Sequence, residues 1–153
     1  MELSKYRILV VDDEEPIRNL IVTFFIRMGH LCVKATDGVD ALNKIKENKI
    51  DAIVTDIKMP NMDGIMLTEE IAKQYPELPV MVMTGFTEEH TAEGAISAGA
   101  REFIQKPFSI EEFTIRFNKM MRDSESLRQV KSEKSDEDIH FLLNELETTL
   151  IKS

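Results

Sequence analysis

Five short apolar runs, each followed by a segment with helical periodicity, constrain the fold of this chain more than any other feature. The runs are rich in Val, Ile and Met, and most are apolar at successive positions, as strands buried on both faces of a sheet are. They cover residues 6–11, 30–35, 52–55, 79–83 and 102–105, and helical patterns follow near 16–28, 39–48, 64–75, 88–98 and from Ile110 onward. This alternation predicts five βα units and a parallel sheet with helices on both faces.

The expected α/β fold is a flavodoxin-like, doubly wound five-stranded parallel sheet with the strand order 2-1-3-4-5, followed by a C-terminal helical extension. Right-handed crossovers leave few other topologies. This order places the first and third strands side by side at the switch point, where such sheets bind ligands beyond the carboxyl ends of their strands. Asp12 and Asp13 follow the first run and Asp56 follows the third. The three carboxylates are therefore expected to share one crevice.

Three further segments are expected to reach the same crevice because they also follow strands. The turn at residues 59–64 comes shortly after Asp56, Thr84 follows the fourth run, and Lys106 follows the fifth. Three carboxylates so close together would raise one another's pKa values unless a cation held them ionised, and oxygen-only ligands suit Mg²⁺. The pattern favours a site at which Asp56 accepts a phosphoryl group and forms an aspartyl phosphate.

The expected catalysis is mostly electrostatic. The transition state of phosphoryl transfer spreads charge over three equatorial oxygens, so positioning and cations supply most of the rate enhancement. Beside the metal, Lys106 is expected to bring a point charge to one oxygen, and the Thr84 hydroxyl a hydrogen bond to another. Pro107 fixes the backbone next to the lysine.

Other active-site motifs fail at specific positions. The sequence has no Gly-x-Gly-x-x-Gly, and residues 94–99 are followed by Ala-Arg in place of the Lys and Ser or Thr of a nucleotide-binding loop. Aspartyl phosphatases of the haloacid-dehalogenase type need an acid two residues after the nucleophile, where this chain has Lys58. Three histidines lack metal-ligand spacing and are expected to be plain surface or strand residues: His30, His90 and His140.

Charge and cysteine usage limit the partners and the compartment. The formal net charge of -9 disfavours attraction to nucleic acid or anionic lipid, so a protein partner is expected for these 153 residues, which hold one ordinary domain and a short appendage. The single cysteine, Cys32, is expected to be a small buried residue in a reducing compartment. The apolar stretch at residues 20–26 is too short to span a bilayer, and the four-residue apolar run before Asp12 is too short for a signal peptide, so neither feature is expected. A cytoplasmic location without a membrane partner is expected.

Over about residues 5–122 the sequence resembles the receiver domain of two-component response regulators. The motifs that carry the resemblance occur in order and at similar intervals: Asp12-Asp13, Asp56, Met59-Pro60, Asp63-Gly64, Thr84-Gly85, Gly99-Ala100 and residues 103–108. The resemblance implies that Asp13 and Asp56 bind Mg²⁺ directly. It also implies the backbone carbonyl of Lys58 as a third protein ligand, with Asp12 acting partly through water.

The resemblance assigns roles to residues around the acceptor. Gly85 is similar to the small residue that the family places beside the phosphoryl group. Phe103 resembles the family's switch aromatic, which turns inward when Thr84 moves toward the phosphate. The bond between Lys106 and Pro107 is often cis in the family, which implies that it helps to aim the lysine.

A sensor histidine kinase or a histidine phosphotransfer protein is the implied phosphodonor. Phosphorylation would change the surface formed by residues 88–98, residues 102–105 and the helix from Ile110, where downstream protein partners of the family usually dock. The same surface or the C-terminal helix is a candidate for homodimer formation. By resemblance, Lys58 and Phe86 flank the path of the hydrolytic water, and they are expected to prolong the phosphorylated state.

The C-terminal part distinguishes the chain from a bare receiver domain at residues 1–122. Residues 123–138 are expected to be a charged linker or a helix extension, and residues 139–153 an amphipathic helix. Together they carry eight acidic and four basic residues, a net charge of -4, which disfavours binding to DNA. One apolar stripe runs along the last helix: Ile139, Leu142, Leu143, Leu146 and Leu150. Folding back on the receiver, binding a partner or second copy, and disorder all stay open.

The sequence thus predicts a single-domain response regulator that is phosphorylated at Asp56 and signals by protein contact. It is expected to catalyse only its own phosphorylation and dephosphorylation. Two alternatives stay open. One is a scaffold that assembles through its C-terminal helix, and the other is a phosphorelay intermediate that hands the phosphoryl group to a histidine.

Overall fold

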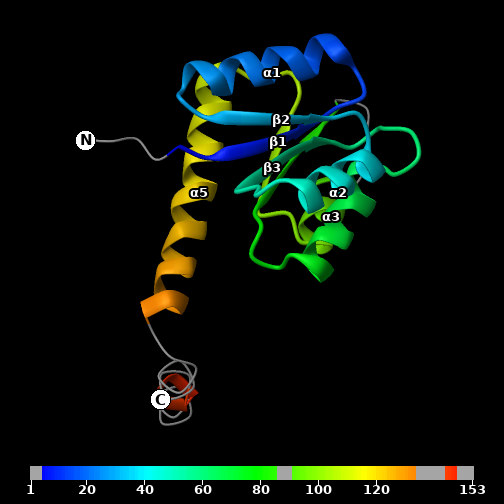
Figure 1. Cartoon of the computed structure of the whole chain (residues 1–153). Coiled ribbons are helices and arrows are strands. Elements are labelled where there is room, and N and C mark those ends of the chain that lie inside the picture. Colours follow the sequence, from blue (N-terminus) through cyan, green and yellow to red (C-terminus); the bar gives the residue numbers. More distant parts are fainter. Residues whose placement is uncertain (1–4, 86–90, 134–143, 148–153) are drawn as a thin grey trace. The chain divides into compact units, whose positions relative to one another are not determined.

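In the described part of the chain up to Glu133, five strands alternate with five helices (Figure 1). The computed structural model describes residues 5–85, 91–133 and 144–147. The strands are β1 (Arg7–Val11), β2 (Leu31–Ala35), β3 (Ala52–Asp56), β4 (Val80–Thr84) and β5 (Glu102–Gln105). The helices are α1 (Glu15–Arg27), α2 (Gly38–Glu47), α3 (Gly64–Gln74), α4 (Thr91–Ala98) and α5 (Ile110–Glu133).

The strands form one parallel sheet in the order β2-β1-β3-β4-β5, which confirms the predicted flavodoxin-like topology. The register pairs Val11 of β1 with Thr55 of β3. Asp12 follows Val11 and Asp56 follows Thr55, so both carboxylates lie at the same edge of the sheet.

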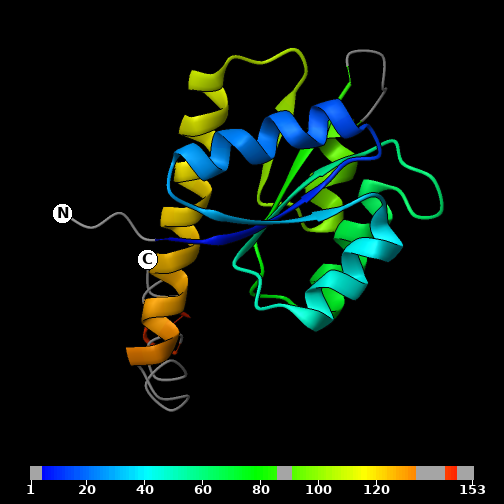
Figure 2. The same ribbon diagram turned by 45° about the horizontal axis from the view of Figure 1, so that its top comes forward.

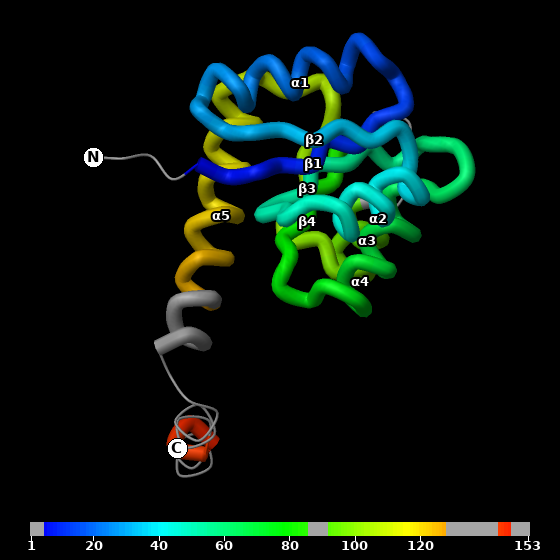
Figure 3. The backbone as a smooth tube through the Cα atoms, viewed as in Figure 1, coloured from blue at the N-terminus to red at the C-terminus, as the bar shows by residue number. Residues whose placement is uncertain are grey.

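Helices cover both faces of the sheet, as Figures 2 and 3 show. One face packs against α1 and the first half of α5 around Phe25, Phe113 and Phe117, all of which are buried. The other face packs against α2, α3 and α4 around residues such as Leu67 and Ile71. All five residues of β3 and of β4 are buried, as the continuous apolar runs predict for central parallel strands.

Short local signals fix where the helices begin and end. Pro16 lies in the first turn of α1, where its missing N–H is not needed. Asp37 and Asp63 cap α2 and α3, because each side chain accepts the backbone N–H three residues later. Gly29 and Gly99 follow α1 and α4 with positive φ angles of 95° and 111°, which glycine adopts without strain.

The position of His30 differs from the predicted surface or strand position. It is 8% exposed and precedes β2, so it is neither a surface nor a strand residue. The turn at Gly29 brings its ring against Tyr6, with 5.3 Å between the ring centroids, and against Phe25 and Phe117. Its Nδ1 accepts the backbone N–H of Tyr6, and burial lowers its pKa. His90 and His140 lie outside the described residues.

Cys32 is partly buried against the α1 and α5 side of the sheet. Burial raises the pKa of its thiol to about 11, so the group stays protonated at neutral pH. It therefore serves as a small apolar residue of β2.

Contacts between Cα atoms divide the chain into two units, Met1–Met121 and Arg122–Ser153. The helix α5 continues to Glu133 and so includes part of the segment for which a linker or a helix extension was predicted. Residues 144–147 are helical and exposed, whereas the other residues of the predicted C-terminal helix lie outside the described ranges. None of the helices in the described ranges combines the length and the apolar character that a membrane span needs.

Candidate phosphoacceptor site

Three carboxylates meet at the carboxyl edge of the sheet. Asp12 and Asp13 directly follow β1, and Asp56 is the last residue of β3. One carboxylate oxygen from each of the three lies within 4.8 Å of the others. Asp12 and Asp56 are buried, with exposures of 0% and 6%, whereas Asp13 is exposed. The site therefore combines two buried carboxylates with one that solvent reaches.

Lys106 brings a cation to the two buried carboxylates. Its Nζ lies 3.3 Å from Asp56 Oδ1 and 3.8 Å from Asp12 Oδ2. The lysine follows β5, its peptide bond to Pro107 is cis, and its backbone N–H donates to the carbonyl of Thr84 at 2.8 Å. The ends of β1, β3, β4 and β5 thus contribute to one site.

Two other predicted site residues, Thr84 and Gly85, lie at the carboxyl end of β4, the strand next to β3. Thr84 is buried at the end of β4, and its hydroxyl donates to the carbonyl of Gly85 at 3.3 Å. Met83, the residue before Thr84, pairs with Asp56 across the sheet. Phe86 lies outside the described residues, so its predicted role in the lifetime of the phosphoryl group stays a prediction.

Lys58 lies in the loop between β3 and α3, and its side chain is exposed. Together with Asp13 and Asp63 it lines an open cavity of about 450 Å³, to which Ile57 and Met59 also contribute. A ligand of the acidic cluster would reach solvent through this cavity. Lys58 occupies the position two residues after Asp56, where phosphatases of the haloacid-dehalogenase type need an acidic residue.

The environment of Asp12 disfavours its ionised form, which a bound cation would stabilise. The pKa of Asp12 is raised to about 6, mainly by burial and to a smaller extent by the neighbouring Asp56 carboxylate, whereas the N–H of Glu14 and the charge of Lys106 oppose the rise. The largest cause is thus burial, and repulsion among the carboxylates contributes less. The buried Asp12 Oδ2 accepts no hydrogen bond within the described part of the chain, because Lys106 Nζ, at 3.8 Å, lies beyond hydrogen-bond distance.

The residues present fit a magnesium ion. The donors are all oxygens, which is the set that Mg²⁺ prefers, and one buried oxygen lacks a hydrogen-bond donor. The carboxylates of Asp12, Asp13 and Asp56 could hold the ion, and Asp13 also lines the open cavity of about 450 Å³.

Arg18 is a site neighbour that the sequence patterns did not reveal. Its Nη1 donates to the backbone carbonyl of Asp12 at 2.8 Å, while Asp12 Oδ1 accepts the N–H of Glu14 at 2.9 Å. The acidic turn is therefore held from both its backbone and its side chain. The only sequence feature that could have indicated this contact was a basic residue six positions after Asp12, on the predicted first helix.

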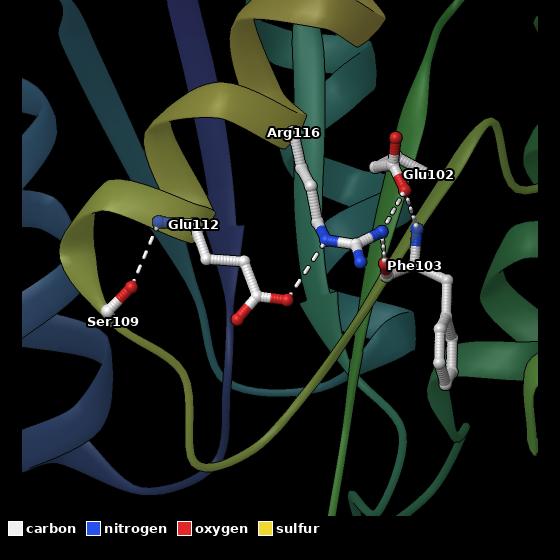
Figure 4. Close-up of polar contacts among 5 residues, drawn as sticks. All are labelled: Glu102, Phe103, Ser109, Glu112 and Arg116. Atoms are coloured by element: carbon white, nitrogen blue, oxygen red, sulfur yellow. Dashed lines mark hydrogen bonds and ion pairs between the residues drawn. The ribbon is translucent and has the colours of Figure 1, made fainter.

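Polar contacts join β5 to α5 on the surface where family partners were expected to dock (Figure 4). Arg116 of α5 contacts Glu102 Oε1 at 3.1 Å and Glu112 Oε1 at 3.2 Å, and it donates to the carbonyl of Phe103 at 3.2 Å. The ring of Phe103 points away from Arg116 and is partly buried on the α2, α3 and α4 side of the sheet. The backbone of Phe103 is thus tied to α5, while its side chain faces the other helices.

The fold and the site define the class of protein. The family model of the response regulator receiver domain matches residues 8–118. The chain belongs to this family, and it is a signalling phosphoacceptor of the two-component type.

Curated and solved relatives agree with this assignment. The chain is 35% identical over 131 residues to the alkaline phosphatase synthesis transcriptional regulatory protein PhoP of Bacillus subtilis. This match covers 86% of this chain and 55% of PhoP. Crystallised NtrX from Brucella abortus superposes with a TM-score of 0.80 at 34% identity, over 86% of this chain and 30% of NtrX. A CheY-like receiver domain protein from Methanospirillum hungatei gives a TM-score of 0.75 at 26% identity, over 80% and 98% of the two chains.

The chain spans about half or less of the length of the curated relatives that it matches. The name of PhoP describes transcriptional regulation. The expectation that nucleic acid has no part in this chain's output therefore stays a prediction.

Proposed function

We propose that Asp56 accepts a phosphoryl group from a sensor histidine kinase or a histidine phosphotransfer protein, in a cytoplasmic pathway that signals through protein contact. The observation that carries the proposal is the position of Lys106, whose Nζ lies 3.3 Å from Asp56 Oδ1 and 3.8 Å from Asp12 Oδ2. A buried carboxylate at a strand end, beside one cation and two further carboxylates, suits a nucleophile that must attack an anionic group.

The transfer exchanges one bond to phosphorus for another. An Asp56 carboxylate oxygen attacks the phosphorus of a phosphohistidine, the P–O bond forms as the P–N bond breaks, and the leaving imidazole nitrogen takes a proton from solvent. Lys106 then pairs with a phosphoryl oxygen in place of the free carboxylate, and the Thr84 hydroxyl donates to another oxygen. Both groups act by position and charge.

Bound Mg²⁺ would neutralise the phosphoryl oxygens and the acidic residues together. The chain's own part is to hold its ligands: Asp12 and Asp13 on the turn clamped by Arg18, Asp56 on β3, and the Lys58 carbonyl on the following loop. We propose the surface of α4, β5 and α5 as the output, with Phe103 coupling it to Thr84. Lys58 is proposed to shield the phosphoryl group from water.

Incubation with acetyl phosphate and Mg²⁺ is expected to add one acid-labile phosphoryl group to the wild type, and none to Asp56→Asn. Asn keeps the size of the side chain but is not a carboxylate nucleophile. Intact-mass spectrometry measures the gain, and Asp123→Asn on the exposed part of α5 is the matched control, which should behave like the wild type. Equal mass gain in the wild type and Asp56→Asn would show that the acceptor is a different residue.

A further inference from the structure

The loop between β3 and α3, residues 57–63, carries the Lys58 carbonyl and lines the cavity beside the acidic cluster. Its ends are fixed by the fold. The N–H of Gly64 donates to the carbonyl of Ile57 at 2.8 Å, and Asp63 caps α3 by accepting the N–H of Met66 at 2.8 Å. Between these ends Met59 and Met62 are partly buried against the core, whereas Lys58, Pro60 and Asn61 are exposed, and a further anchor holds this exposed tip of the loop.

The anchor comes from the neighbouring loop between β2 and α2. Asn61, at the tip of the first loop, donates from Nδ2 to Asp37 Oδ2 at 2.7 Å. The second oxygen of Asp37, Oδ1, accepts the N–H of Asp40 at 2.8 Å and so caps α2. One carboxylate thus holds the start of a helix and the tip of the loop that follows the acceptor strand.

Backbone contacts beside this bridge show that the two loops are closely fitted. The N–H of Gly38 donates to the carbonyl of Met62 at 3.1 Å. A side chain at Gly38 would come within 2.8 Å of the Met62 carbonyl oxygen, so the loops approach more closely than any other residue there allows. Asn61 has a φ angle of 66°, a left-handed conformation that Asn, Asp and Gly tolerate best.

The bridge is of the stronger, charge-assisted kind. Hydrogen bonds from the Asp40 N–H and then from the Asn61 amide lower the pKa of Asp37, so its carboxylate is ionised at neutral pH. Mg²⁺ demands near-ideal octahedral geometry, and a site loses affinity when its supporting residues let a ligand drift by a fraction of an ångström. A loop that carries one ligand therefore needs to be positioned before the ion arrives.

We propose that Asp37 and Asn61 are positioning residues for the cation site, because their bridge holds the loop that supplies the Lys58 carbonyl. This inference rests on the proposed function, since it concerns the ion that would support phosphorylation of Asp56. Neither residue needs to touch the ion. Both act through the backbone of residues 57–63.

Two variants with the wild-type net charge test the bridge. Asn61→Gly removes the amide and keeps a residue that adopts the left-handed backbone without strain. The double variant Asp37→Asn with Asn61→Asp exchanges donor and acceptor, so the new Asn can donate to the new Asp across the same gap. Asn caps helices as well as Asp does, and Asp tolerates the left-handed conformation. The double variant therefore restores the bridge with no change in charge.

Titration calorimetry with MgCl₂ is the measurement. We expect Asn61→Gly to bind Mg²⁺ about threefold to tenfold more weakly than the wild type, which is the range for the loss of one ordinary hydrogen bond and is appropriate because this one is exposed to solvent. The exchanged pair should bind within about twofold of the wild type. Asn48→Gly, at the other end of α2 and so at the opposite edge of the sheet, is the matched control and should leave the affinity unchanged.

The outcomes separate the bridge from the site itself. Wild-type affinity in Asn61→Gly, or affinity in the exchanged pair as weak as in Asn61→Gly, would overturn the positioning role while leaving the proposed function intact. Failure of the wild type to bind Mg²⁺ would overturn both. Thermal unfolding without Mg²⁺ checks that each variant is folded, and a purely structural role would lower its melting temperature without weakening Mg²⁺ binding.

Discussion

Replacing Asp12 with Asn is expected to stabilise the metal-free protein at pH 8 and to abolish its binding of Mg²⁺. The pKa of Asp12, raised from 3.8 to about 6, corresponds to roughly 3 kcal/mol by which ionisation of this buried group destabilises the fold. Asn retains the oxygen that accepts the N–H of Glu14 and carries no charge. The variant thus removes an electrostatic penalty together with a metal ligand.

The stabilisation should depend on pH in a defined direction. Folded Asp12 keeps its proton up to about pH 6, whereas the unfolded chain releases it near pH 3.8. The wild type therefore loses stability relative to Asp12→Asn as the pH rises from about 4 to about 6, and the full difference is present above that window. Groups that titrate equally in both proteins, Asp37 among them, cancel from the comparison.

Urea unfolding of both proteins in the presence of a chelator, at pH 4 and at pH 8, measures this difference. The electrostatic explanation would be contradicted if Asp12→Asn were less stable than the wild type at pH 8. It would also be contradicted if the difference in free energy of unfolding between the two proteins were the same at pH 4 and at pH 8. Calorimetry on the same two proteins at pH 8 tests the loss of Mg²⁺ binding.

Replacing Gly64 with Ala is expected to lower the free energy of unfolding by about 3 kcal/mol and to suppress phosphorylation of Asp56. A Cβ at this position would overlap the backbone carbonyl oxygen of Asp56 and approach the Ile57 Cα to 3.0 Å. These are backbone atoms that cannot rotate away. Relief of the overlap must shift either the start of α3 or the end of β3, where the acceptor lies.

Gly94→Ala is the matched control, since no described atom outside the helix lies within 4 Å of a Cβ built there. In α4 this change should stabilise the protein by up to about 1 kcal/mol through helix propensity. The same gain is available to Gly64→Ala in α3, so a large net loss must come from the overlap. Urea unfolding of the two variants decides the matter, and wild-type stability in Gly64→Ala would show that the backbone yields easily.

The sequence was sufficient for the architecture because the architecture depends on local patterns. The apolar runs and helical periodicities determine the order of elements, and the topology then carries Asp12, Asp56 and Lys106 to one edge of the sheet. Such convergence needs no knowledge of side-chain conformations.

Contacts between loops could not be predicted in the same way. The bridge between Asp37 and Asn61 joins residues 24 positions apart, and it depends on how closely two loops approach. Arg18 reaches a backbone carbonyl, which has no sequence signature. His30 is buried because a glycine turn directs it toward aromatic residues of other elements, although its own residue type is compatible with a surface position.

Asp56, and neither of its acidic neighbours, is expected to carry the phosphoryl group. Sodium borodeuteride reduces an acyl phosphate on an aspartate to a deuterated homoserine, and tandem mass spectrometry of the digested protein then locates it. After treatment with acetyl phosphate and Mg²⁺, we expect deuterated homoserine at position 56 alone. Deuterated homoserine at position 12 or 13, or a phosphorylated protein that yields none at position 56, would contradict it.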